Sequence, residues 1–182
     1  MTDYNEEEII RQLQDPNQCR NAFSKIIGIY QERIYWQIRK MVVSHDDADD
    51  IMQNTFLKAW KNIDTFRGES KISTWLYRIA VNESITFLAR QRQEKALTTD
   101  EDLYLIDNLE ADEYFDGNEI EKLLQEAILH LPEKQRLVFN MRYFDEIKYE
   151  DMSEILNTSV GALKASYHIA AKKIEEYLVS NG

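Results

Sequence analysis

The chain has few of the residues that interrupt helices or build covalent frameworks. Its 182 residues include 5 glycines, 2 prolines and 1 cysteine. Scarce glycine and proline beside plentiful Leu, Ile, Glu, Lys and Gln argue against a turn-rich sheet protein and favour long helices. The single cysteine, Cys19, excludes an internal disulfide and is given no role. An all-α fold is therefore expected, and 43% hydrophobic residues are enough for packed cores.

Long apolar runs and clustered metal ligands are also missing. No run approaches the roughly 20 apolar residues that span a bilayer, and the acidic start of the chain lacks the features of a signal peptide. This predicts a cytoplasmic protein without membrane insertion. The three histidines are isolated from one another, and no phosphate-binding loop or nucleophile motif is present. We therefore expect no metal, no cofactor and no catalytic residue.

The net charge of −11 by itself argues against binding to nucleic-acid phosphates. Its distribution reverses that argument. Residues 1–19 carry 5 acidic and 1 basic side chains, and residues 96–119 carry 9 acidic and no basic side chains. Residues 20–95 carry 13 basic and 9 acidic side chains. The acid is concentrated in two short segments, and the first half of the folded chain is basic.

The first half of the chain has the pattern of a three-helix domain over residues 18–95. Apolar residues recur at spacings of three and four over 18–43, which predicts an amphipathic helix. Ser44 and the carboxylates after it predict a cap and a second helix to about residue 62. A polar loop over 64–70 precedes a third helix over about 71–92. Residues 1–17 form an acidic N-terminal segment to which we assign no structure.

An acidic segment separates this domain from a second one. Residues 96–118 hold no basic residue and show no sustained period, which predicts a flexible linker. Helical periodicity then returns, with Pro132 expected at the first position of a helix. Two further helices, over 149–156 and 159–178, complete a four-helix domain that covers residues 119–180.

The last two helices have the form of a helix-turn-helix. Asn157 tolerates the positive φ of a tight turn, and Ser159 is a good N-cap. In this motif the second helix lies in the major groove with its N-terminal residues at base edges. Short helix pairs are common, so the pattern alone leaves other functions open. The candidate DNA contacts are Ser159, Gly161, Ala162, Lys164, Ala165, Ser166, His168 and Lys172.

A second candidate site lies in the third helix of the first domain. Trp75, Arg78 and Asn82 recur at helical spacings of three and four, which places an aromatic ring, a cation and an amide on one face. Such a surface can stack on an unpaired base and form hydrogen bonds with it. The alternative is that Trp75 belongs to the hydrophobic core, and spacing alone favours that alternative.

Four segments, in this order, resemble the signatures of the extracytoplasmic-function (ECF) group of sigma factors in the sigma-70 family. They are residues 46–60, 66–82, 131–136 and 149–156. The resemblance covers about residues 20–178. It implies that the two domains are sigma regions 2 and 4, joined by the linker without a region 3 domain.

The resemblance also implies function. It predicts a factor without catalytic chemistry that is monomeric when free, binds core RNA polymerase, and directs promoter recognition, DNA melting and transcription initiation. An anti-sigma factor is an expected partner. The implied polymerase-binding residues are Asp49, Asp50, Ile51, Gln53, Asn54, Phe56, Leu57 and Trp60. The implied contacts with the minus-ten element are Asp64, Phe66, Arg67, Ser70, Lys71, Trp75, Arg78 and Asn82.

By the same resemblance, the helix from Ser159 reads the minus-thirty-five element and the linker threads the RNA-exit path. Burial within their own domain is the alternative for Phe56 and Trp60, and a merely solvated tether is the alternative for the linker. Ser166, Ile169 and Ala171 stand where the family commonly has arginine, so the second domain alone is expected to bind DNA weakly.

Two rival functions stay open at this point. A stand-alone helix-turn-helix regulator would bind duplex DNA without polymerase. A helical interaction module, such as an anti-sigma-type adaptor, would have no sequence-specific effect on DNA. Both leave the region 2 signatures unexplained.

Overall fold

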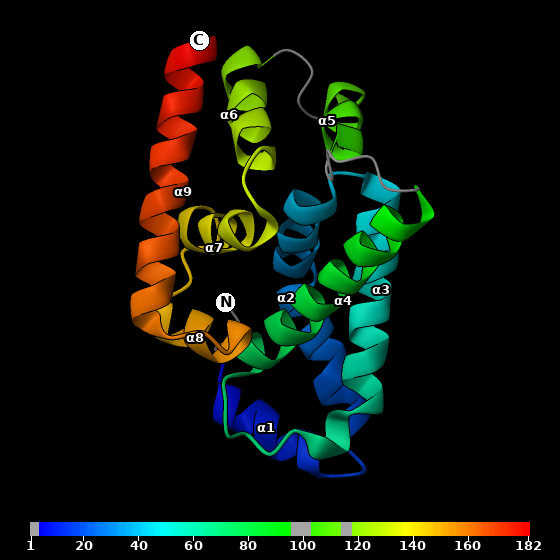
Figure 1. The fold of residues 1–182 in the computed structure, drawn as a ribbon. Coiled ribbons are helices and arrows are strands. Elements are labelled where there is room, and N and C mark those ends of the chain that lie inside the picture. The colour runs from blue at the N-terminus through cyan, green and yellow to red at the C-terminus, as the bar shows by residue number, and fades with distance from the viewer. Residues whose placement is uncertain (1–3, 96–102, 114–117) are drawn as a thin grey trace.

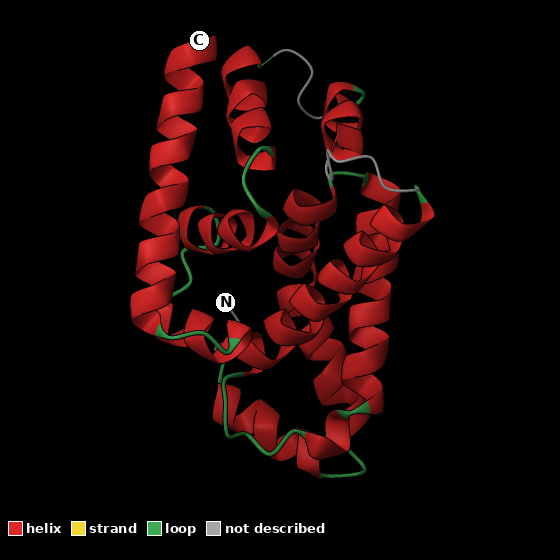
Figure 2. Ribbon diagram, in the orientation of Figure 1, coloured by secondary structure: helices red, strands yellow, loops and turns green. Residues whose placement is uncertain are grey.

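In a computed structural model of the protein, residues 4–95, 103–113 and 118–182 are described, and these ranges contain helices, turns and loops but no strand (Figures 1 and 2). None of the helices in these ranges has the length and apolar character needed to cross a bilayer. The α-helices are α1 (Glu6–Gln14), α2 (Cys19–Val42), α3 (His45–Lys61), α4 (Ile72–Glu94), α5 (Leu103–Glu110), α6 (Glu119–Leu129), α7 (Glu133–Tyr143), α8 (Tyr149–Leu156) and α9 (Val160–Asn181).

Helix α1 is an addition to what the sequence predicts, because the acidic N-terminal segment carries no structural assignment there. The Asn5 side chain caps it by accepting a hydrogen bond from the Glu8 amide at 3.2 Å. Ile9 and Leu13, one turn apart, bury against the core beside α2. A cap followed by this apolar spacing is a helix signal, although a short one among many acidic residues.

The three helices predicted for the first domain are confirmed as α2, α3 and α4, each within two residues of the expected bounds. They pack against one another around buried Ile26, Ile34 and Leu76. The Ser44 hydroxyl accepts a hydrogen bond from the Asp47 amide at 3.3 Å, as expected of an N-cap that opens an acidic first turn. The polar loop joins α3 to α4.

The second domain consists of α6 to α9, as predicted (Figure 1). Asn157 ends α8 in the left-handed conformation, with φ 49° and ψ 47°. One expectation was wrong: Pro132 is not the first residue of α7 but its N-cap, because its ψ of 144° is extended. The aromatic ring of Phe139 stacks on Tyr143 and on Tyr167, which joins α7 to α9.

The linker is more ordered than its composition predicts. Residues 103–110 form α5, whose Leu105 and Leu109 are fully buried in the core. Just after it, Asp112 forms a buried ion pair with Arg39 of α2. The expectation of flexibility over 96–118 therefore fails for this part, because two leucines one turn apart find an apolar surface. Residues 96–102 and 114–117 lie outside the described ranges.

The two domains pack against each other in what we call the closed arrangement, defined by α8 lying on α4 and α7 lying on α2 (Figure 1). A single apolar core runs through the contact. It includes Ile147, Met152 and Ile155 of the second domain together with residues of α2 and α4. A smaller core between α6, α7 and α9 belongs to the second domain alone. The closed arrangement therefore buries apolar surface as well as forming polar contacts.

Candidate nucleic-acid interface and partner surface

The helix-turn-helix is formed by α8 and α9. The Ser159 hydroxyl accepts a hydrogen bond from the Ala162 amide at 3.2 Å and starts α9. Leu163 and Ala170 are buried and turn one face of α9 toward the domain core. The opposite face is solvent-exposed. Of the candidate DNA contacts on α9, Gly161, Ala162, Lys164, Ala165, His168 and Lys172 are exposed and Ser166 is half-buried.

The loop before α4 is held together by an aromatic stack. Phe66 is buried, and its ring lies on the Trp75 ring with centroids 4.7 Å apart and planes 29° apart. Trp75 itself is half-buried, so part of its ring packs in the domain and part is accessible to solvent. Gly68 adopts a φ of +74°, which glycine tolerates without strain. Asp64 and Arg67 extend from this loop into solvent.

Arg78 and Asn82, the polar members of the same candidate site, lie against the helix-turn-helix. They line a cavity of about 440 Å³ together with Glu154 and Asn157 of α8 and the turn after it. The Arg78 guanidinium donates a hydrogen bond to the Glu154 carbonyl at 2.6 Å. Arg78 and Asn82 remain solvent-exposed beside α8, and in the closed arrangement α8 and the turn after it form the other wall of the cavity.

Further polar contacts join the two domains around this face. The Lys71 ammonium lies 3.0 Å from a carboxylate oxygen of Asp151, and the Arg92 guanidinium lies 2.5 Å from a carboxylate oxygen of Glu133. The Asp151 carboxylate, by its hydrogen bond and its charge, raises the pKa of Lys71. Asp151, Glu133 and Glu154 were not identified from the sequence, because a carboxylate on an exposed helix face does not indicate its partner.

Asp145 is the most buried of these contacts. Its carboxylate lies 3.0 Å from the Lys40 ammonium of α2, and only one of its two oxygens has a hydrogen-bond partner among the described residues. Burial raises the pKa of Asp145, although Lys40 and Arg33 lower it. Burial and the nearby Asp145 charge also raise the pKa of Tyr77 to about 12. The contact between Lys40 and Asp145 therefore places the charged carboxylate of Asp145 where water solvates it poorly.

The candidate partner surface lies on α3 and is partly apolar. Leu57 is 57% exposed and Trp60 is 39% exposed, whereas Phe56 and Ile51 are buried. The rings of Phe56 and Trp60 both contact Phe23 of α2, at centroid distances of 6.5 and 5.1 Å. Among the polar residues predicted for this surface, Asp50, Gln53 and Asn54 are exposed and Asp49 is half-buried.

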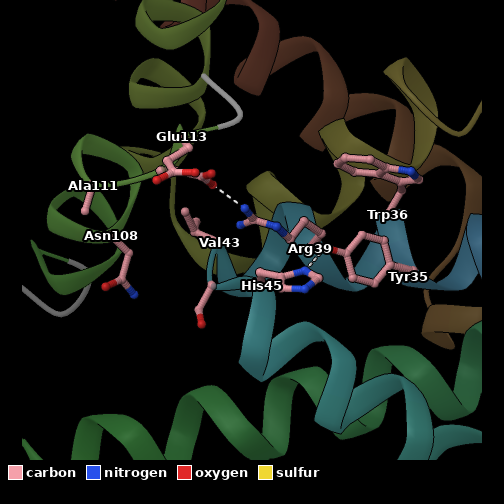
Figure 3. A pocket seen from close by; sticks show the side chains of 10 residues that line it. Tyr35, Trp36, Arg39, Val43, His45, Asn108, Ala111 and Glu113 are labelled. Carbon is pink, nitrogen blue, oxygen red and sulfur yellow. Dashed lines mark hydrogen bonds and ion pairs between the residues drawn. The ribbon is translucent and has the colours of Figure 1, made fainter. Parts of the chain in front are cut away.

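A cavity of about 470 Å³ lies where the linker meets α2 and the start of α3. Figure 3 shows the Arg39 side chain pointing from α2 toward the segment after α5, where it pairs with Asp112. Tyr35 and His45 lie on the other side of Arg39, joined by a hydrogen bond of 2.6 Å. The ion pair of Arg39 with Asp112 holds the segment after α5 on the first domain. The sequence did not identify them, because the linker contact depends on the tertiary structure.

Comparisons with known families agree with this division of the chain. The family described as Sigma-70 region 2 matches residues 26–94, and the family described as Sigma-70, region 4 matches residues 121–174. The first match begins inside α2 and runs to the end of α4, with the loop between α3 and α4. The second begins in α6 and ends in α9, and it includes the helix-turn-helix.

Individual relatives match almost the whole chain. The ECF RNA polymerase sigma factor SigW of Bacillus subtilis is 33% identical over 178 residues, which cover 93% of this chain and 94% of the relative. The ECF RNA polymerase sigma-E factor of Haemophilus influenzae is 31% identical over 165 residues, which cover 86% of this chain and 87% of the relative.

Solved structures share the fold. CnrH in complex with the cytosolic domain of CnrY has a TM-score of 0.73 and 19% identity, and the match covers 97% of this chain and 99% of CnrH. The sigma factor RpoE in complex with the anti-sigma factor NepR, from Bartonella quintana, has a TM-score of 0.67 and 19% identity. The match covers 88% of this chain and 98% of RpoE. With both family matches in order and SigW 33% identical over nearly its full length, the chain belongs to the sigma-70 family, as a sigma factor of the ECF group.

Proposed function

We propose that this protein binds core RNA polymerase through region 2, finds the upstream promoter element through region 4, and opens and holds the downstream element with the loop and face of α4. The observation that carries the proposal is that one chain presents two different DNA-facing surfaces. One is a capped helix-turn-helix with an exposed reading face. The other is an aromatic loop beside a polar helix face, suited to unpaired bases.

The apolar patch of Leu57 and Trp60 is the proposed centre of the polymerase contact. Exposed large apolar side chains on a helix that also carries exposed polar residues are typical of a protein interface. The ring of Trp60 is held by Phe23, so little side-chain freedom is lost when a partner covers it. Phe56 and Ile51 support this surface from the core.

The minus-ten element is the proposed ligand of the loop and of α4. Melting is assisted when an extruded base is trapped by stacking and by hydrogen bonds to its edge. Trp75, whose ring is supported by the buried Phe66 ring, supplies the aromatic surface, and Asn82 supplies an amide that can donate and accept. Arg78 is suited to a phosphate or to a base face.

The minus-thirty-five element is the proposed ligand of α9, which would lie in the major groove of intact duplex. Lys164 and Lys172 are exposed cations on this face, whereas Ala171, Ile169 and Ser166 carry no charge. Few phosphate contacts mean a weak affinity for DNA by itself, so binding would depend on polymerase.

We expect DNA binding to open the closed arrangement, because α8 and the turn after it line one cavity with Arg78 and Asn82 and the Arg78 guanidinium is already hydrogen-bonded to Glu154. The contact between the domains includes buried polar groups that lower the stability of the closed arrangement. Gln37 of α2 and Asn140 of α7, on helices that pack together, are buried with no hydrogen-bond partner among the described residues. Each such group costs about 1–3 kcal/mol. Polymerase would thus separate the domains, and the linker would leave α2 to follow the RNA-exit path.

We further propose that the free protein is monomeric, acts in the cytoplasm with polymerase, and is held inactive by an anti-sigma factor. Two of its structural neighbours bear on the last point: CnrH binds the cytosolic domain of CnrY, and RpoE binds the anti-sigma factor NepR. No catalytic step is proposed, since each role requires only binding.

The proposal is tested by mixing the purified protein with bacterial core polymerase and following the complex by size-exclusion chromatography. The complex is then applied to genomic promoter fragments, and unpaired thymines are mapped with permanganate. A stable complex that melts particular fragments supports the proposal and yields the promoter sequence. A folded protein that does not bind polymerase but binds duplex DNA tightly would instead support a polymerase-independent regulator.

A further inference from the structure

Helix α1 reaches across the first domain to the start of α4. One carboxylate oxygen of Glu6 accepts a hydrogen bond from the Ile72 amide at 2.7 Å, and the other accepts one from the Tyr4 hydroxyl at 3.2 Å. The Tyr4 hydroxyl also lies 2.5 Å from the Tyr30 hydroxyl of α2. Both oxygens of Glu6 are therefore engaged, and the carboxylate is tied to α2 as well as to α4.

The start of α4 has no cap of its own. Lys71 occupies the N-cap position and makes no side-chain capping bond. The first amides of a helix lack partners within the helix, and a carboxylate there also interacts favourably with the helix dipole. Glu6, 66 residues away in sequence, thus does what a local Ser, Thr or Asp does elsewhere.

Helix α1 also contacts the loop. A Cβ added at Gly68 would lie 3.1 Å from the Ile10 Cγ2 atom, so α1 sits directly against the loop backbone. Ile9 and Leu13 anchor α1 in the core. The segment 68–72 is consequently held at both ends by α1, at Gly68 through Ile10 and at Ile72 through Glu6.

We infer that α1 is a positioning element for the minus-ten loop, and that Glu6 is its positioning residue. By fixing the segment between Gly68 and Ile72, it holds the loop and the Trp75 ring in place before DNA arrives. A surface that is already ordered loses less entropy when it traps an unpaired base. The inference rests on the function proposed above for this loop.

The test compares Glu6→Ala, Glu6→Gln and the control Glu7→Ala, whose side chain is exposed in the same turn. Hydrogen exchange of the Ile72 amide in the free protein reports the capping bond without polymerase or DNA. Affinity for core polymerase and the rate of promoter opening, followed by permanganate, report function. The promoter is one that the wild-type protein melts.

Glu6→Ala should speed exchange at Ile72 and lower the opening rate about fivefold, the factor expected from one lost capping bond, with polymerase affinity unchanged. Glu6→Gln keeps an acceptor and should restore most of the rate, and Glu7→Ala should match the wild type. The inference is overturned if Glu6→Ala leaves exchange and opening unchanged, or lowers polymerase affinity as much as opening. A wild-type protein that neither binds polymerase nor melts DNA would refute the proposed function instead, while exchange at Ile72 still reports whether Glu6 caps α4.

Discussion

The Lys71 ammonium lies 3.0 Å from a carboxylate oxygen of Asp151, so the start of α4 in region 2 is tied to the first turn of α8 in region 4. The Lys71 side chain is 55% exposed. An ion pair this exposed contributes at most about 1 kcal/mol. The buried apolar contacts at Met152 and Ile155 therefore contribute more to the closed arrangement than the ion pair does.

Asp151→Ala is accordingly expected to shift the equilibrium toward open molecules by no more than about fivefold. Ile155→Ala should shift it further, since truncating a buried isoleucine costs about 2 kcal/mol or more. Single-molecule energy transfer between dyes on exposed positions of α2 and α9 measures both populations, and Glu150→Ala is the matched control. Complete opening by Asp151→Ala would contradict this ranking.

Asp145 predicts a pH dependence of closure. Burial raises its pKa in the closed arrangement, so the closed state binds the proton more tightly than the open state, where the carboxyl is solvated. Closure should become more favourable as the pH falls through the raised pKa, and less favourable as the pH rises above it. The same energy-transfer measurement, repeated as the pH is lowered from neutral toward the ordinary carboxyl pKa of 3.8, detects this change. Asp145→Asn should remove the dependence, and Glu146→Gln, at the exposed neighbour, should retain it.

Truncating the apolar patch of α3 should weaken polymerase binding. Leu57→Ala and Trp60→Ala are each expected to lower affinity for core polymerase about tenfold, because exposed aromatic and aliphatic anchors carry much of an interface's energy. Leu57 is the cleaner variant, since Trp60 also contacts Phe23. Val179→Ala, at an apolar residue 80% exposed on α9, is the control. Unchanged affinity in both α3 variants would place the polymerase contact elsewhere.

Asn82→Ala should separate binding from melting. Polymerase affinity is expected to stay within about twofold of the wild type, whereas promoter opening should fall about tenfold through the loss of one hydrogen-bonding side chain at the trapped base. Permanganate reactivity of the assembled complex measures opening, and Thr86→Ala, exposed one turn further along α4, is the control. Loss of polymerase binding by Asn82→Ala would show that α4 does not serve DNA alone.

Adding a cation to the exposed face of α9 should strengthen binding to duplex DNA. Ser166→Arg is expected to increase affinity for minus-thirty-five duplex and to steepen the logarithmic salt dependence by about 0.9, the value for one additional phosphate contact. Fluorescence anisotropy over a series of salt concentrations measures both quantities. Ser180→Arg adds the same charge at the far end of α9 and should change neither. Equal effects of the two variants would mean that total charge, and not the reading face, controls binding.

The sequence by itself determined the local structure of this protein. Caps and apolar spacing predicted α2 to α4 and α6 to α9, because helix ends and amphipathic faces depend on neighbouring residues. Ser44, Asn157 and Ser159 have the conformations that their chemistry predicts. Family resemblance predicted the functional surfaces on α3, α4 and α9. The short helices α1 and α5 were missed, since each is stabilised by an apolar surface elsewhere in the fold.

Only the tertiary structure decided how these pieces meet. Ion pairs such as Arg39 with Asp112, and the capping bond from Glu6 to Ile72, join residues far apart in sequence. No local pattern predicts them, because any exposed carboxylate has several cations that it can pair with. The same holds for the burial of Phe56 and the partial exposure of Trp60 in neighbouring turns of one helix. Their exposure depends on where α2 packs, and packing is a property of the whole fold.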